Sequence, residues 1–395
     1  MSFAETVRVP GRVALRLDPL GVLIALIAGA GLFLPFAVFK ANRIVPGEGL
    51  LVWNALPPPL LAPLLGAVGF AVVAALLTVP PWLKLCASVA ALIVLALCVG
   101  MAAGMLAPEA KGYARVSIGA GFWLLAFALA LMLTDALSRR KLPPIQRLAF
   151  LILAIAAVCG LLWSGAWNEL SILKEYSSQA PAFWLQARTH VLLALTSVAL
   201  AVAIGVPLGI ASYKFEKMRR TTLNVLNVIQ TIPSIALFGM LIVPLAWVGA
   251  NVPGASDVGI SGIGTAPAMV ALVVYALLPI VANTLVGLTG LPSATVEAAR
   301  GMGMSPMQRL ALVELPLALP VILTGIRIVL VQNIGLVTIA ALIGGGGFGV
   351  FVFQGIGQTA ADLVLLGAVP TVALAFIAAV VLDSFIEMSA GRTKA

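Results

Sequence analysis

Long apolar runs recur along the whole chain and constrain its fold more than any other feature of the sequence. A helix rises about 1.5 Å per residue, so about 20 apolar residues cross the roughly 30 Å of hydrocarbon in a bilayer. In lipid such runs must be helices, because only a helix satisfies its own backbone polar groups. The chain has 62% hydrophobic and 9% charged residues, whereas soluble domains carry roughly 25% charged residues. We therefore predict an all-α integral membrane protein.

The apolar runs predict about ten transmembrane helices. The first run is too long for the apolar core of a signal peptide, so we expect it to be retained. Prolines within the runs are expected to break or kink several helices; these are Pro207, Pro233, Pro244, Pro279 and Pro320. The predicted spans are 20–39, 60–79, 85–106, 117–137, 148–167, 189–211, 222–249, 267–290, 317–342 and 363–388.

The basic residues divide unequally between the two sides of these spans. With the N-terminus in the cytoplasm, the cytoplasmic side receives Arg8, Arg12, Arg16, Lys84, Arg139, Arg140, Lys141, Arg147, Lys214, Lys217, Arg219, Arg220, Arg300, Arg309, Arg392 and Lys394. The other side receives Lys40, Arg43, Lys111, Arg115, Lys174 and Arg188. This asymmetry follows the positive-inside rule and predicts that both termini are cytoplasmic. Topology thus accounts for the net charge of +9 without a nucleic-acid partner.

The polar stretch "WNELSILKEYSSQAPAFWLQARTH" separates two dissimilar halves of the chain. Residues 1–167 are predicted to form an N-terminal extension of five membrane helices. Residues 168–188 are predicted to be an extracytoplasmic connector, long enough for an amphipathic helix at the membrane surface. Residues 189–395 carry nearly all of the remaining motifs.

The cysteines and the single histidine do not suggest a metal site. Cys86, Cys98 and Cys159 lie in or beside apolar spans without the spacing of metal ligands, so we predict small core residues rather than ligands or a disulfide. His190 lies at the mouth of the sixth span, where a structural hydrogen bond is the simpler interpretation and a special role the alternative.

The stretch "EAARGMGMSPMQRLALVELP", residues 297–316, interrupts the apolar pattern. Pro292 can open a helix at its first position, where the missing N–H costs nothing. Gly301 and Gly303 are predicted to end that helix, because glycine readily adopts the left-handed conformation found past a helix end.

A second helix is predicted to follow directly. Ser305 is a candidate N-cap, with Pro306 at the first position and Gln308 completing a capping box. Pro316 disfavours helical geometry in Leu315, so this helix should be about 15 Å long and too short to cross a bilayer. The segment is thus either a cytoplasmic helix-turn-helix held by another protein or an ordinary amphipathic loop.

The same segment resembles the EAA-x3-G-x9-I-x-LP signature of type I ABC importer permeases, with Val313 in place of the usual Ile. The resemblance implies that the loop 291–316 is the coupling helix that docks in a cleft of a cytoplasmic ATPase. The residues to which this role extends are Glu297, Ala298, Ala299, Arg300, Gly301, Gly303, Ser305, Pro306 and Pro316.

Three further stretches, "IQTIPSIALFGMLIVPL", "YALLPIVANT" and "IGGGGFG", resemble the osmoprotectant branch of that family. The resemblance covers about residues 185–388 and implies import of a small solute such as glycine betaine or choline by alternating access, in a bacterial cytoplasmic membrane. The five-helix extension is a departure from the usual permease of this branch. An amino acid or another small polar solute is the alternative substrate.

The resemblance also implies partners. The chain has no G-x-x-x-x-G-K-[ST] phosphate loop, so ATP hydrolysis would belong to a separate ATPase dimer that holds ATP and Mg. The chain is therefore predicted to be a transport subunit rather than an enzyme, with no cofactor or metal of its own. A second permease subunit, identical or paralogous, and a periplasmic or lipid-anchored substrate-binding protein complete the expected assembly within membrane lipid.

Gly344, Gly346 and Gly349 match the dinucleotide pattern G-x-G-x-x-G, but they follow a membrane span rather than the strand of a βαβ unit. We predict instead a non-helical loop at the external mouth, where a loaded binding protein would dock.

Arg327 lies near the middle of the ninth span, where a guanidinium costs at least about 2.5 to 3.5 kcal/mol. It is either held by an ion pair or carbonyls within the bundle, which we favour, or lies on the wall of the translocation path near Gln332 and Asn333.

An ion-coupled secondary transporter is the rival class. It should show carboxylates within the membrane or a repeated hydropathy pattern. Asp135, Asp362 and Asp383 lie near span ends, and the halves of the chain differ. A membrane-embedded enzyme is less well supported, because the sequence shows no nucleophile or acid–base pair.

Overall fold

The computed structural model describes residues 17–42, 45–107 and 113–392, with side chains to residue 389. These residues form two compact units. Unit 1 contains the described residues up to Leu142 together with Gly160–Leu173, and unit 2 contains Pro143–Cys159 and the described residues from Lys174 onward. The basic residues Arg8, Arg12, Arg16, Arg43, Lys111 and Lys394 of the topology prediction lie outside the described residues.

Unit 1 is built from α1 (Pro19–Leu32), the short α2 (Val52–Ala55), α3 (Pro58–Leu76), α4 (Pro81–Leu106) and α5 (Ala120–Arg139). Three of the helices, α1, α3 and α4, begin with proline, which lacks only an N–H that a first turn would leave unpaired. The core between the helices consists largely of alanine, leucine and valine side chains. Small side chains allow helices to approach closely, as expected in a membrane.

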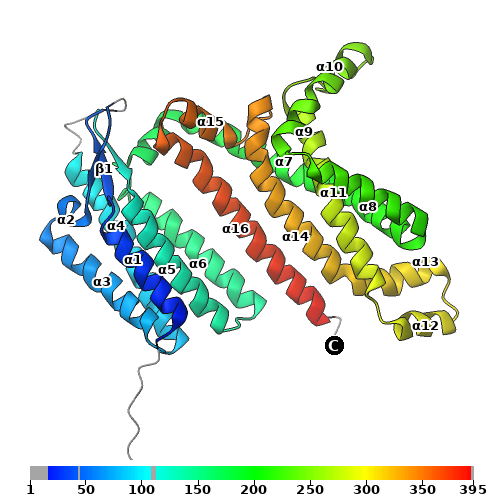
Figure 1. Cartoon of the computed structure of the whole chain (residues 1–395), viewed down its shortest axis with the longest axis horizontal. Coiled ribbons are helices and arrows are strands. Elements are labelled where there is room, and N and C mark those ends of the chain that lie inside the picture. The colour runs from blue at the N-terminus through cyan, green and yellow to red at the C-terminus, as the bar shows by residue number, and fades with distance from the viewer. Residues whose placement is uncertain (1–16, 43–44, 108–112, 393–395) are drawn as a thin grey trace, which may run out of the picture. The chain divides into compact units, whose positions relative to one another are not determined.

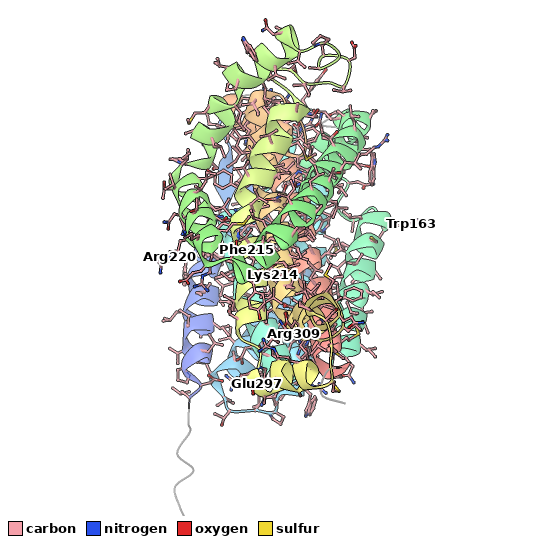
Figure 2. All side chains as sticks on the ribbon, turned by 90° about the vertical axis from the view of Figure 1, so that its right-hand side faces the viewer. Trp163, Lys214, Phe215, Arg220, Glu297 and Arg309 are labelled. Carbon is pink, nitrogen blue, oxygen red and sulfur yellow. The ribbon has the colours of Figure 1, made fainter. Side chains whose placement is uncertain are left out.

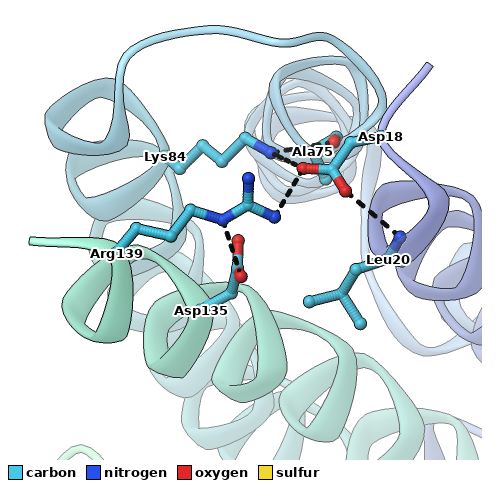
Figure 3. A network of polar contacts seen from close by, with 6 residues as sticks. All are labelled: Asp18, Leu20, Ala75, Lys84, Asp135 and Arg139. Atoms are coloured by element: carbon cyan, nitrogen blue, oxygen red, sulfur yellow. Dashed lines mark hydrogen bonds and ion pairs between the residues drawn. The ribbon is translucent and has the colours of Figure 1, made fainter.

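A cluster of ion pairs joins one end of unit 1 (Figure 3). Asp18 caps α1 by accepting a hydrogen bond from the Leu20 N–H, and it also accepts from Lys84 Nζ and Arg139 Nη2, each at 2.8 Å. Arg139 Nε donates to Asp135 at 2.8 Å. Asp18 and Lys84 are buried, and the cluster ties α1, α4 and α5 together where sequence reasoning predicted no contact.

A small antiparallel sheet lies at the opposite end of these helices (Figure 1). It consists of β1 (Ala37–Lys40), β2 (Glu48–Leu50) and β3 (Arg115–Ile118) in the order β2-β1-β3. The predicted span 20–39 is therefore wrong at its end, because α1 ends at Leu32 and the chain continues as a strand. Pro35 disfavours a continuing helix, and the stretch AVFK, which contains valine and phenylalanine, suits a strand.

Unit 2 holds the longer series of helices. They are α6 (Pro144–Trp163, whose last turn belongs to unit 1), α7 (Ser171–Lys214), α8 (Glu216–Thr231), α9 (Ser234–Met240), α10 (Ile242–Asn251), α11 (Thr265–Thr289), α12 (Ser293–Gly301), α13 (Pro306–Arg309), the π-helix η1 (Leu310–Glu314), α14 (Leu315–Ala340), the 3-10 helix η2 (Ala341–Ile343), α15 (Gly349–Gly357) and α16 (Ala361–Arg392). Helix α14 packs against α11 and α16. Figure 1 shows α12 and α13 beyond one end of α11 and α14, away from α15 at the other end.

Nine helical segments within the described residues are long and apolar enough to cross a membrane, and α1 is a shorter apolar helix. The predicted helical membrane fold is confirmed. The predicted span 222–249 is wrong, because three helices occupy it: α8 ends at Thr231, and α9 and α10 follow. The cause is Pro233, which lacks an N–H and leaves Ile232 extended.

The connector 168–188 is mostly helical, because α7 starts at Ser171 and departs from helical geometry only at Gln179. The division of the chain near residue 167 stays a prediction.

Of the cysteines, only Cys98 is buried as predicted. Cys86 and Cys159 lie exposed on α4 and α6, on helix faces that carry other apolar side chains.

Candidate functional site

The turn after α12 forms a complete helix C-cap. Gly303 adopts the left-handed conformation with φ of 79°, its N–H donates to the Arg300 carbonyl, and the Met304 N–H donates to the Ala299 carbonyl. These two bonds are the Schellman motif, which satisfies carbonyls left free at a helix end. The sequence prediction is off by one residue at each end of α12, since Pro292 is the N-cap and Gly301 is the last helical residue. Gly303 alone makes the turn.

The second helix begins with the predicted capping box. The Gln308 N–H donates to Ser305 Oγ at 3.3 Å, and the Ser305 N–H donates to Gln308 Oε1 at 2.9 Å. Pro306 occupies the first helical position. Both ends of the turn 302–305 are therefore fixed by hydrogen bonds.

The prediction that this helix ends at Leu315 is wrong. Leu315 is helical, and α13, η1 and α14 form one apolar segment from Pro306 to Ile343. The π-helix η1 reconciles Pro316 with the helix, because the Leu315 N–H donates to Leu310, five residues back, and shifts the hydrogen-bond register before the proline. Arg309 Nε reaches the buried Glu314 carboxylate, also five residues away, at 2.6 Å. We did not predict this ion pair.

The segment 291–316, named here the coupling segment, presents most of its side chains to the surface. Ala299 is buried, whereas Glu297, Ala298 and Arg300 are exposed, as are Gly301 and Gly303. Met302 and Met307 are 70% and 69% exposed. A depression of about 340 Å³ lies beside α12, lined by Tyr213, Leu288, Thr289, Leu291, Ser293, Val296, Glu297 and Arg300. Figure 2 shows Glu297 and Arg309 at this end of unit 2. An exposed, internally braced segment with apolar and charged groups is suited to contact with another protein.

Arg327 forms an ion pair with Asp383 of α16, as the structural interpretation of this residue requires. Gln332 is partly buried. Asn333 is buried, and its Nδ2 donates to Ser197 Oγ at 2.8 Å and to the Leu272 carbonyl at 3.4 Å. The structure therefore does not bring Arg327 and Asn333 into one cluster. Their role in a translocation path stays a prediction.

The glycine loop is non-helical from Gly344 to Phe348, as predicted, and Gly349 begins α15. Gly344, Gly346 and Gly347 have φ of 80°, 78° and 85°, values that favour glycine. A Cβ on Gly349 would lie 1.9 Å from the Thr338 carbonyl oxygen, so glycine is needed there for close approach. Dinucleotide binding is not indicated, since the loop leads from η2 to α15 and no strand precedes it.

Two side chains of α7, which sequence reasoning did not connect to this loop, hold it in place. Gln186 Oε1 accepts a hydrogen bond from the Gly347 N–H at 2.7 Å. His190 is fully buried; its Nδ1 accepts from the Phe348 N–H at 3.2 Å and its Nε2 lies 3.0 Å from the Ile334 carbonyl. A carbonyl can only accept, so Nε2 carries the proton and the ring is neutral. His190 is thus a structural hydrogen-bonder, as predicted.

The multi-helix membrane fold and the EAA signature together indicate the transmembrane subunit of a transporter. The chain belongs to the family of binding-protein-dependent transport system inner membrane components, whose family model matches residues 201–394. A second family model, the N-terminal domain of the ABC transporter permease YehY, matches residues 18–173. The resemblance identified from the EAA signature is confirmed.

Curated relatives match the second half of the chain. The osmoprotectant import permease protein OsmW of Salmonella typhimurium is 42% identical over 188 residues, which are 48% of this chain and 82% of the relative. The choline transport system permease protein OpuBB of Bacillus subtilis is 38% identical over 188 residues, 48% of this chain and 79% of the relative. Among solved structures, an inward-facing form of the MetNI methionine ABC transporter is 24% identical, with a TM-score of 0.46, over 53% of this chain and 95% of that chain.

Proposed function

We propose that this chain is the membrane-spanning subunit of an ATP-driven importer for small quaternary-amine osmoprotectants such as choline or glycine betaine. The relatives named for osmoprotectant and choline transport support this substrate class, since they align over four fifths of their own length. The observation that carries the proposal is the coupling segment, whose EAA residues lie on an exposed helix fixed by a Schellman motif and a capping box.

A cytoplasmic ATPase dimer binds the coupling segment and supplies the energy of ATP hydrolysis. A second permease subunit completes the path, and a substrate-binding protein delivers the solute at the glycine loop. Both termini lie in the cytoplasm of a bacterium, on the side of most basic residues.

The chain's own contribution to the mechanism is a stiff mechanical link. Movement of the coupling segment passes directly into the bilayer through the continuous helix from Pro306 to Ile343 and through α11, which precedes α12. The Arg309–Glu314 pair braces the π-helical joint between coupling segment and span. Closure and reopening of the ATPase dimer thus expose the path alternately to the two sides.

Uptake in proteoliposomes tests the proposal. The complex with its ATPase and binding protein should accumulate labelled choline or glycine betaine only when ATP is inside with the ATPase. Glu297→Lys should reduce uptake to background while leaving membrane insertion intact, because it reverses an exposed charge on the docking surface. Glu48→Lys is the matched control, an exposed acid of unit 1 outside the coupling segment.

Undiminished uptake by Glu297→Lys would remove the coupling role from this segment. Uptake of neither solute by the unaltered complex, with ATP hydrolysis intact and responsive to another solute, would assign a different substrate.

A further inference from the structure

Helix α8 carries a line of exposed polar side chains beside the face that packs on its own unit. On the packed face, Leu226 is buried and Gln230 Nε2 donates to the Tyr275 carbonyl of α11 at 3.0 Å. A line of exposed polar residues runs beside the packed face, at spacings of four, three and four residues that keep its members on one side of the helix. This polar stripe consists of Arg220, Asn224, Asn227 and Thr231. The exposed Val225 and Val228 lie further round the helix.

The polar stripe extends from the basic end of α8 into the bilayer. Lys214, Lys217 and Arg219 gather at that end, which the positive-inside rule assigns to the cytoplasm. Figure 2 shows Lys214, Phe215 and Arg220 together at the corner between α7 and α8. At about 1.5 Å per residue, Thr231 lies about 16 Å beyond Arg220, roughly the middle of a 30 Å hydrocarbon core.

Lipid is an unsuitable environment for this face. The side-chain amides of Asn224 and Asn227 have no hydrogen-bond partner among the residues that the structure describes. Amides in hydrocarbon would lose the hydrogen bonds that water provides. The polar stripe must therefore face water or another polar surface.

The inner end of the polar stripe coincides with the break in the helix. Helix α8 ends at Thr231. Tyr275 of α11 donates a hydrogen bond to the Ile232 carbonyl, and this bond fixes the position of the break. In the last turn the Val228 carbonyl accepts from Thr231 Oγ1 at 2.6 Å and the Ile229 carbonyl accepts from the Ile232 N–H at 3.1 Å. The helix dipole still leaves partial negative charge at this end. Broken helices near the bilayer midplane present such ends to cations in other transporters.

We propose that the polar stripe lines the cytoplasmic half of a water-filled substrate path, and that the α8 break at Thr231 is a binding site for a quaternary ammonium cation. Such a cation has no N–H to donate, so carbonyl dipoles and amide oxygens attract it without a fixed carboxylate. Glu216 accepts a hydrogen bond from Arg220 at 3.3 Å, and its carboxylate offsets the positive charge at the cytoplasmic entrance of the path. This inference rests on the proposed function and names the surface that holds its substrate.

Thiol labelling of the complete complex in inside-out vesicles tests the path. Cys86, Cys98 and Cys159 are first replaced by serine in a variant that still transports. Asn227→Cys is then compared with Ile204→Cys, a position exposed on α7. A charged, membrane-impermeant thiosulfonate should modify Asn227→Cys at least about tenfold faster, because the reactive thiolate forms in water and not in lipid. Choline or glycine betaine should slow that modification.

Equal and slow modification of the two variants would overturn the proposal. So would a disulfide between two copies of Asn227→Cys that forms regardless of substrate, since the polar stripe would then be an interface between subunits. The unaltered complex could import another solute but neither choline nor glycine betaine. If that solute then slowed a fast modification of Asn227→Cys, the polar stripe would still line the substrate path. The quaternary ammonium site and the proposed substrate would both be wrong.

Discussion

At the scale of single residues, the coupling segment depends on backbone conformation more than on side-chain chemistry. Sequence reasoning predicted the capping box because its two partners lie three residues apart on the chain, and hydrogen bonds of that range follow from local sequence. It missed the Arg309–Glu314 pair because a helix of ordinary pitch does not bring residues five apart together. The π-helix that does so depends on the surrounding packing.

Gly303→Ala should impair coupling, whereas Gly301→Ala should be tolerated. Neither glycine has a neighbouring atom within 4 Å of an added Cβ, so space does not distinguish them. Gly303 has φ of 79°, where an alanine costs about 1 to 2 kcal/mol, and Gly301 is helical, where alanine is favoured by about 1 kcal/mol. The measurement is transport per ATP hydrolysed. Equal losses in the two variants would show that the left-handed turn is unimportant.

Arg327→Leu should lower the thermal unfolding temperature in detergent more than Arg327→Leu combined with Asp383→Leu. The single change leaves the Asp383 carboxylate unpaired among apolar helices, whereas the double change removes both charges. Because both side chains are partly exposed, the difference should be modest. A double variant that folds normally but does not transport would instead assign the pair to the substrate path.

At the scale of elements, the helices of the apolar runs were predictable and the junctions between them were not. Local hydrophobicity sets the existence of α3, α4 and α11, but not the end of α1, where β1 leaves the predicted span to pair with β2 and β3. Strand pairing over such distances has no local signal. Pro233 was predicted to break or kink a span, yet its consequence, a short α9 separated from α8, depended on the contacts of Tyr275.

Deleting Leu312 should uncouple ATP hydrolysis from transport. Leu312 is exposed within η1, so its removal costs little burial. The deletion would convert the π-turn to an α-turn and remove the register shift that accommodates Pro316, so the proline should kink the joint between the coupling segment and α14. Leu312→Ala is the control and should retain transport. ATPase activity and uptake are measured together. Normal transport by the deletion variant would argue that the orientation of the segment is adjustable.

The Asp18 cluster should make unit 1 sensitive to acid (Figure 3). The hydrogen bond from Lys84 lowers the pKa of Asp18 below its usual value. A carboxylate with a lowered pKa stabilises the fold above its unfolded pKa of about 3.9, and this contribution is lost as the pH falls through the folded pKa. Asp18→Asn should therefore unfold at a lower temperature than the native chain at pH 7, and the difference should shrink below about pH 4. A difference independent of pH would assign the effect to helix capping alone.

At the scale of the whole molecule, the two units have different relationships to known proteins. The curated relatives align with about half of this chain, whereas a separate family model matches residues 18–173. Unit 1 contains the described part of 1–142, with the apolar helices α1, α3, α4 and α5, while α6 begins in unit 2. The composition of the runs predicted the helices of both units, but the assignment of α6 depends on tertiary contacts such as Arg147 with Glu387.

Removing residues 1–142 should leave a transport-competent subunit, whereas removing residues 1–167 should not insert correctly. The shorter deletion removes four apolar helices, an even number, so Arg147 at the start of α6 should stay on the side that the positive-inside rule predicts to be cytoplasmic, and α7 should keep its orientation. The longer deletion also removes α6, so the polar start of α7 must cross the membrane without a preceding helix. Thiol labelling at Thr359→Cys and Gly301→Cys reports the orientation of each variant, and uptake reports its activity. An inverted shorter variant would mean that α1, with only 14 residues, does not span the bilayer.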